Sequence, residues 1–182
     1  GTDAVMLSGE TAVGKYPVQA VGMMGAIIRQ AEPKLEKWGH WQAGAEGCLP
    51  VEEGFQQDDA ISITRAAAEL ARDRNVAAIA VFTQSGRTAQ FMSKARPNVP
   101  ILAFTPNQPT YRILPMMWGV IPYLVPYADS MEAMLKDVEA AMITASPLQA
   151  GQQVVLISGF PIGAMRQPNL ALLYTIGDLQ MG

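Results

Sequence analysis

The chain has 182 residues, of which 49% are hydrophobic and 16% charged, so it can bury one sizeable core with an appendage and is not a disordered chain. Its net charge of −3 leaves no excess of Lys and Arg for nucleic acid or anionic lipid, which favours small molecules or proteins as partners. No apolar run approaches the roughly 20 residues that span a bilayer, and no signal-peptide pattern opens the chain, so we expect no membrane partner and a cytoplasmic location.

Residues 1–38 are typical of one βα unit. The run Ala4-Val5-Met6-Leu7 predicts a short buried strand, residues 8–12 a loop, and Pro17 the first position of a helix, where its missing N–H costs nothing. The apolar residues of that helix cover a wider face than one packing partner needs, and nothing nearby supplies further partners. We therefore expect this region to be either poorly ordered or packed against another copy of the chain.

Residues 39–57 are typical of a linker, with four glycines and one proline among acidic and amide residues. The only histidine, His40, and the only cysteine, Cys48, lie here, which excludes a disulfide within the chain and a Cys/His zinc site. A Ser-His-Asp triad would depend on His40, and a linker does not give a triad base the rigid surroundings that it needs. We interpret both side chains as incidental and exposed.

Residues 58–182 alternate helix and strand patterns, beginning with a helix that Asp58 or Asp59 can cap. Apolar strands separated by amphipathic helices indicate a parallel sheet covered on both faces, while the short connection before the last strand makes that strand an antiparallel edge. The predicted fold class is thus α/β, a three-layer sandwich with a mostly parallel five-stranded sheet and an antiparallel edge strand. Pro115 lies inside one predicted helix, so we expect that helix to be short or kinked. The strands are expected at 77–82, 101–104, 121–125, 154–158 and 170–176, and the helices between them at 88–95, 110–118 and 130–144.

The segment between the first of these strands and the following helix has the composition of a phosphate-binding loop. Its hydroxyls can donate to phosphate oxygens, its glycine lets the backbone come close, and the start of the helix adds partial positive charge. Its arginine can add a charge-assisted hydrogen bond. A turn of this composition is also often only a helix cap, so both interpretations stay open on this segment alone. Its residues are Thr83, Gln84, Ser85, Gly86, Arg87 and Thr88.

Three loops follow the carboxyl ends of predicted parallel strands, where ligands bind in sheets of this kind. They are residues 83–88, 105–108 and 158–169. Arg166, in the third loop, can close over a phosphate held by the first. The alternative is that Arg166 is a solvated surface arginine, which is the common case for an arginine.

Two parts of the chain resemble pyruvate kinases. The run at 1–12, Gly-Thr-Asp-Ala-Val-Met-Leu-Ser-Gly-Glu-Thr-Ala, followed by Gly-Lys-Tyr-Pro at 14–17, resembles the end of the family's catalytic barrel. The 83–88 loop, Trp118-Gly119-Val120 and Gly159-x-Pro161-x-Gly163 resemble its C-terminal domain. The resemblance implies three parts: the last βα unit of an incomplete TIM barrel at 1–38, detached from the rest of its barrel, a linker at 39–57, and the C-terminal domain at 58–182.

The resemblance also implies an activity for the parent enzyme, a homotetramer that transfers phosphoryl from phosphoenolpyruvate to ADP with magnesium and potassium. Ser8 and Glu10 match residues at the rim of the family's active site. The family's other catalytic groups lie upstream of this match, so we expect the chain alone to be catalytically inactive and to bind no metal. The abrupt start without an initiator Met favours a truncated chain.

The 83–88 loop matches the one that holds the phosphate of a sugar-phosphate or nucleotide effector in regulated members. The last loop departs from the family: Arg166-Gln167-Pro168-Asn169 stands where many bacterial members have Gly-Thr-Thr-Asn or Gly-Ser-Thr-Asn, which leaves the effector open. One alternative is a sugar-phosphate isomerase-like module, although no catalytic base is evident for it. Another is an interaction module that assembles through the edge of the last strand.

Overall fold

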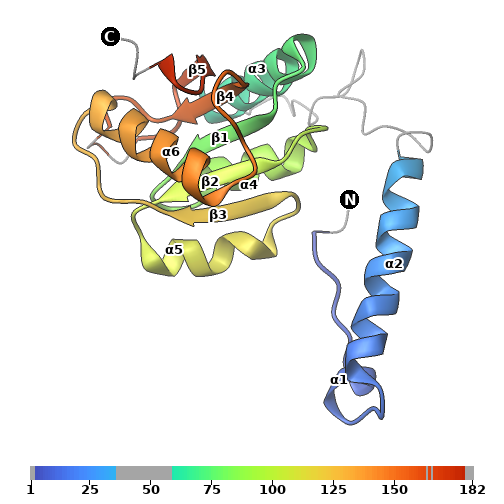
Figure 1. The fold of residues 1–182 in the computed structure, drawn as a ribbon. Helices are drawn as coiled ribbons and strands as arrows, with labels where there is room; N and C mark the ends of the chain where they lie inside the picture. Colours follow the sequence, from blue (N-terminus) through green and yellow to red (C-terminus); the bar gives the residue numbers. More distant parts are fainter. Residues whose placement is uncertain (1–2, 36–58, 163, 165, 179–182) are drawn as a thin grey trace, which may run out of the picture. The chain divides into compact units, whose positions relative to one another are not determined.

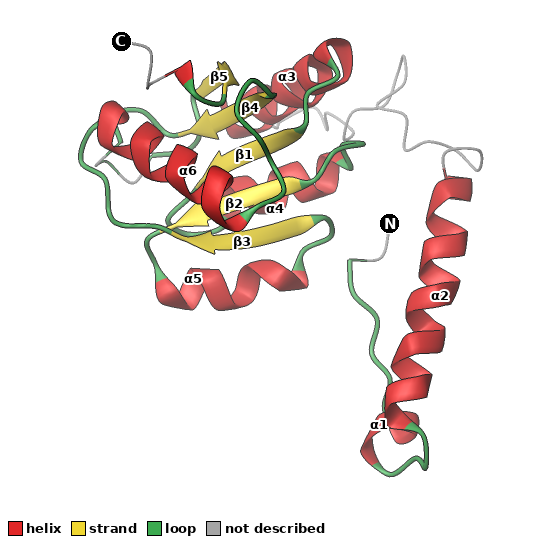
Figure 2. Cartoon of the chain, in the orientation of Figure 1, coloured by secondary structure: helices red, strands yellow, loops and turns green. Residues whose placement is uncertain are grey.

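The computed structural model describes residues 3–35, 59–162, 164 and 166–178 (Figures 1 and 2). Its contacts divide the chain into two compact units, Gly1–Phe55 and Gln56–Gly182. The predicted linker, with His40 and Cys48, lies outside the described residues.

The described part of the first unit, residues 3–35, contains two helices, α1 (Gly9–Ala12) and α2 (Pro17–Leu35). The strand predicted at Ala4–Leu7 is wrong, because this segment is extended but unpaired among the described residues, and Met6 is 85% exposed. A strand exists only with a hydrogen-bonded neighbour, which an apolar run cannot supply by itself. The loop predicted at 8–12 is also wrong, since the Ser8 carbonyl accepts from the Ala12 N–H at 2.9 Å and closes the turn of α1.

Helix α2 begins at Pro17 as predicted. The apolar face expected for this helix lies largely exposed, with Val18 at 78% and Val21 at 56%. The first unit therefore presents apolar surface that its own described residues do not cover.

The second unit is built on a five-stranded sheet with the order β3-β2-β1-β4-β5. All pairs are parallel except β4 with β5, which is antiparallel and places β5 at the edge, as predicted. The helix that contains Pro115 in the prediction ends early and continues as a 3₁₀ turn, η1, which confirms the expected shortening. The elements are α3 (Asp59–Arg74), β1 (Ala78–Phe82), α4 (Arg87–Ala95), β2 (Ile101–Thr105), α5 (Gln108–Ile113), η1 (Leu114–Met116), β3 (Val120–Leu124), α6 (Met131–Ala145), β4 (Gln153–Ser158) and β5 (Leu170–Thr175).

Helices cover both faces of this sheet, which makes the three predicted layers (Figure 2). Alternate residues of β1 point to opposite faces, so Ala80 packs in the core beneath α6 and Ile79 in the core beneath α3 and α4. Met134 of α6 and Met92 of α4 are fully buried in these two cores. The sheet is thus fixed on both sides, and the loops at the carboxyl ends of its strands start from rigid positions.

Candidate effector site

A cavity of about 180 Å³ lies at the carboxyl ends of β1 and β4. These strands are neighbours in the sheet, but β1 leads to β2 on one side while β4 lies on the other, so the strand order reverses between them. Ligands bind at such reversal points in open α/β sheets. The cavity is lined by Phe82, Thr83, Gln84, Ser85, Arg87 and Thr88 from the first loop and by Gly159, Ile162, Ala164, Arg166, Gln167 and Pro168 from the third.

The first loop is shaped by its own hydroxyl groups. The Gly86 N–H donates to Thr83 Oγ1 at 3.0 Å, and the Arg87 N–H donates to Ser85 Oγ at 3.4 Å. Gly86 has φ +85°, a left-handed conformation that glycine adopts without steric cost, and this explains the glycine at this turn. A hydroxyl that accepts one bond keeps its hydrogen, so Thr83 and Ser85 can still donate to a ligand.

Helix α4 starts directly behind this loop. Its first intrahelical bond runs from the Gln90 N–H to the Gly86 carbonyl at 3.0 Å, so the N–H groups of its first turn have no partner within the helix. Such groups and the helix dipole favour an anion. Thr88, in this first turn, is 6% exposed and lines the cavity.

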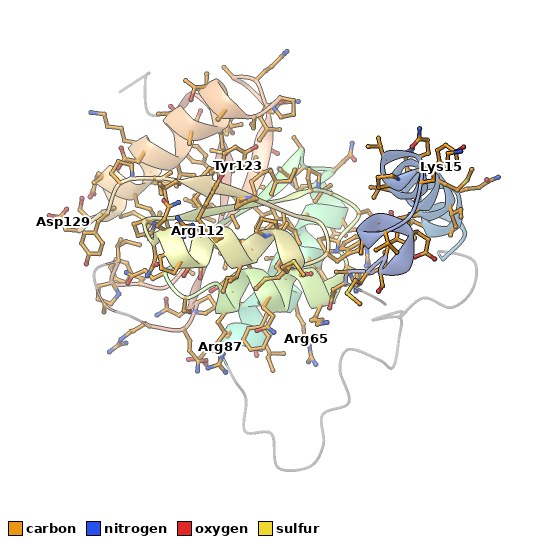
Figure 3. All side chains as sticks on the ribbon, turned by 90° about the horizontal axis from the view of Figure 1, so that it is seen from below. Lys15, Arg65, Arg87, Arg112, Tyr123 and Asp129 are labelled. Carbon is orange, nitrogen blue, oxygen red and sulfur yellow. The ribbon has the colours of Figure 1, made fainter. Side chains whose placement is uncertain are left out.

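Two arginines and no carboxylate are among the described residues that line the cavity. Arg87 is exposed at the surface of the second unit (Figure 3). Its guanidinium lies over the Phe91 ring, 5.2 Å from the centroid. Arg166 is also exposed and comes from the opposite wall. The cavity therefore combines hydroxyl donors, a helix N-terminus and two cations, which suits a phosphate.

The third loop is held by two features that the sequence did not reveal. The Asn169 side chain accepts from the Phe160 N–H at 2.7 Å and donates to the Phe160 carbonyl at 2.9 Å, so it closes the loop as a paired strand would. At Gly159 an added Cβ would lie 2.7 Å from the Arg166 carbonyl oxygen, so any residue other than glycine would clash with the Arg166 backbone. Both features hold the segment that carries Arg166.

Residues 105–108, the second loop that was expected to converge here, do not line the cavity. This loop instead caps α5: the Thr105 hydroxyl accepts from the Asn107 N–H at 3.2 Å, and the Asn107 side chain accepts from the Thr110 N–H at 3.5 Å. The Thr110 hydroxyl in turn donates to the Gln84 carbonyl at 2.7 Å. Sequence reasoning missed Thr110, because a contact across 26 residues leaves no local pattern.

Ser8 and Glu10 lie in the first unit and are exposed. Ser8 precedes α1, and Glu10 lies in its first turn, with no side-chain hydrogen bond from Ser8 to cap the helix. Within the described ranges, no group of three or more His, Cys, Asp or Glu side chains is placed to hold a metal ion. None of the helices in those ranges is long and apolar enough to cross a membrane.

Comparisons with known proteins agree on one family. The family model for the pyruvate kinase alpha/beta domain matches residues 61–173. The chain is 37% identical over 179 residues to pyruvate kinase of Geobacillus stearothermophilus, covering 98% of the chain and 29% of the relative. It is 36% identical over 169 residues to that of Agrobacterium vitis, covering 93% of the chain and 34% of the relative.

A crystal structure of a pyruvate kinase from Cryptosporidium parvum superimposes with a TM-score of 0.74 at 29% identity, covering 94% of this chain and 32% of that one. The chain thus spans about a third of the length of the relatives that it matches, as their shares of 29% and 34% show. The fold, the motifs at 83–88 and 159–163 and these matches point to the same conclusion. The chain belongs to the pyruvate kinase family and carries its alpha/beta domain.

Proposed function

We propose that this chain is the C-terminal part of a pyruvate kinase, in which the second unit binds a phosphorylated metabolite as an effector. The parent enzyme would transfer phosphoryl from phosphoenolpyruvate to ADP. The observation that carries the effector proposal is the cavity between loops 83–88 and 159–169, which has two arginines and no carboxylate among its described lining residues. Its position at the N-terminus of α4 supports the same ligand chemistry.

The ligand is a phosphate ester of a small polar molecule. The phosphate would accept from the hydroxyls of Ser85 and Thr88 and from the first-turn N–H groups of α4, with Arg87 and Arg166 supplying charge. Phe82 and Ile162 give the cavity apolar walls against which a sugar or nucleoside can pack. A cavity of about 180 Å³ suits a sugar phosphate or a part of a nucleotide.

Calorimetric titration with fructose 1,6-bisphosphate, ribose 5-phosphate and AMP tests the effector site. We expect at least one of these to bind, and the double variant Ser85→Ala, Thr88→Ala to bind it more weakly. Salt should weaken binding too, because charged partners are screened. Absence of heat from all three ligands with the unaltered chain would overturn the proposal.

Phosphoryl transfer is not expected from this chain alone. Ser8 and Glu10 provide no clamp for a transferring phosphoryl group, and that chemistry depends on positioning and electrostatic stabilisation. The described residues also offer no cluster that fits the magnesium of the parent enzyme, so we assign no metal-dependent step to them. Pyruvate formation above a blank from the purified chain would contradict this.

We further propose that the chain self-associates, as a homotetramer in the parent enzyme. The edge strand β5 supports this, because the outer side of an edge strand offers backbone groups for pairing. The isomerase-like alternative is less well supported, since no carboxylate or histidine that could act as a base is among the described residues lining the cavity.

A further inference from the structure

We infer that Thr110 of α5 is a positioning residue that holds the 83–88 loop in its ligand-binding shape, an inference that rests on the proposed function. Thr110 lies outside the cavity lining and is 6% exposed. Its hydroxyl donates to the Gln84 carbonyl oxygen at 2.7 Å. A partly buried bond of this length between distant segments fixes the direction of that carbonyl.

The direction of the Gln84 carbonyl decides what Ser85 presents to a ligand. In a trans peptide the C=O of one residue and the N–H of the next point in opposite directions. With the Gln84 carbonyl turned towards Thr110, the Ser85 N–H points away from α5. This N–H makes no hydrogen bond within the described part of the chain, and Ser85 lines the cavity. The Thr110 bond therefore leaves a backbone donor available to a phosphate oxygen.

The other side of Ser85 is supported by the same residue. An added Cβ at Gly86 would lie 3.4 Å from Thr110 Cγ2 and 3.6 Å from Leu114 Cδ2, so the Gly86 backbone packs closely on α5 and η1. Leu114 is fully buried, which makes this support rigid. Thr110 thus bonds to the Gln84 carbonyl through its hydroxyl and lies close to Gly86, the other neighbour of Ser85.

Thr110 is itself firmly placed. The Asn107 side chain accepts from its N–H at 3.5 Å, and the Tyr111 N–H donates to the Asn107 carbonyl at 2.9 Å, so the first turn of α5 is closed around it. Because α5 follows β2 directly, the loop after β1 is braced by the element after the neighbouring strand. The loop is therefore positioned from outside as well as by its own hydroxyls.

The test compares Thr110→Val, which removes only the hydroxyl donor, with Thr110→Ser, which keeps it. Thr64→Val is the matched control, because the buried Thr64 hydroxyl donates to the Ala60 carbonyl at 2.6 Å within α3, and Thr64 does not line the cavity. The probe is inorganic phosphate, followed through the amide NMR signals of Ser85 and Gly86. The same spectra without phosphate give the hydrogen exchange of the Gly86 N–H, which bonds to Thr83 Oγ1.

We expect Thr110→Val to weaken phosphate binding and to speed Gly86 exchange, each by about three- to tenfold, the usual effect of one hydrogen bond. Thr110→Ser, which keeps the hydroxyl, should lose less than Thr110→Val in both measurements, and Thr64→Val should stay close to the unaltered chain. Gly86 exchange that is unchanged in Thr110→Val would overturn the inference. If the unaltered chain shows no response to phosphate, the proposed function fails while Gly86 exchange still decides the role of Thr110. If Thr110→Val does not fold, Thr110→Ala is compared with Thr110→Ser, because both lack the methyl group of Thr110 and only the serine keeps the hydroxyl.

Discussion

At the scale of single residues, Gly86 allows a test of whether the shape of the 83–88 loop affects ligand binding independently of the free energy of unfolding. An alanine at φ +85° costs about 1–2 kcal/mol of stability, as for other left-handed residues with a Cβ. Gly151 has nearly the same φ, +86°, but open space around its Cβ position. We expect Gly86→Ala and Gly151→Ala to lose similar free energies of unfolding in urea. Only Gly86→Ala should weaken binding of a sugar phosphate, because only Gly86 lies in the 83–88 loop, whose shape depends on the left-handed conformation at this position. Equal binding by both variants would count against this loop as the phosphate site.

Tyr123 allows a prediction about alkaline pH. Burial raises the pKa of its phenol above the ordinary value of 10.0, and its ring stacks on Phe104 at 5.2 Å between centroids. The unfolded chain therefore releases this proton at a lower pH than the folded chain does. Stability from this group is fully present below pH 10.0 and is lost as the pH rises towards the folded pKa.

Urea unfolding between pH 8 and 11 checks this effect. We expect the free energy of unfolding of Tyr123→Phe, which keeps the stacked ring, to fall less steeply above about pH 10, the ordinary phenol value. The two proteins differ only in this phenol, so the difference between the two curves isolates Tyr123. If the free energies of unfolding of the two proteins fall in parallel with pH, burial has little influence on the pKa of this phenol.

At the scale of elements, the loop between β4 and β5 depends on one amide. Replacing Asn169 by alanine removes both bonds to Phe160, so the loop should loosen and Arg166 should lose its fixed position. We expect ligand binding about three- to tenfold weaker, as for the loss of one or two hydrogen bonds at an exposed site. The control is Gln152→Ala, which removes a comparable side-chain bond to the Gln149 N–H far from the cavity. Calorimetry measures the ligand affinity of both variants. Equal affinities would reject this role for Asn169.

A buried carboxylate joins α6 to the edge strand. Glu139 is 4% exposed and accepts hydrogen bonds from the Tyr174 hydroxyl and from the Gly177 N–H, the latter at 2.8 Å. Tyr174→Phe leaves this carboxylate with fewer donors, so we expect a loss of about 1.5–3 kcal/mol, the range for hydrogen bonds to charged groups. Tyr111→Phe is the control, because the Tyr111 hydroxyl makes no hydrogen bond within the described residues. Urea unfolding measures the free energy of unfolding of both variants. A similar loss in the two would contradict a stabilising hydrogen bond between Tyr174 and Glu139.

Much of this arrangement could be predicted from the sequence where local pattern decides structure. The five strands, the antiparallel edge and the break at Pro115 follow from short apolar runs, connection length and proline geometry. The segment Ala4–Leu7 could not be predicted in this way, since pairing depends on a partner elsewhere in space. The same holds for Thr110 and Asn169, whose roles arise from contacts with residues distant in sequence.

At the scale of the whole molecule, the exposed face of α2 predicts self-association. Val21 and Ile27 of this helix are 56% and 57% exposed. We expect sedimentation velocity to show association that grows with concentration. Ile27→Glu should weaken it by about tenfold or more, since burying a large aliphatic side chain contributes about 1.5–3 kcal/mol. Ile143→Glu, at a 40% exposed site on α6, is the control. A strict monomer at every concentration would contradict the prediction.

The cavity takes one wall from the first strand of the sheet and the other from the segment that connects its last two strands. During synthesis the loop after β1 leaves the ribosome long before its counterpart exists. A nascent chain would therefore bind the metabolite only after nearly the whole sheet has been made. Binding of the metabolite would then occur only in a chain whose second unit has folded.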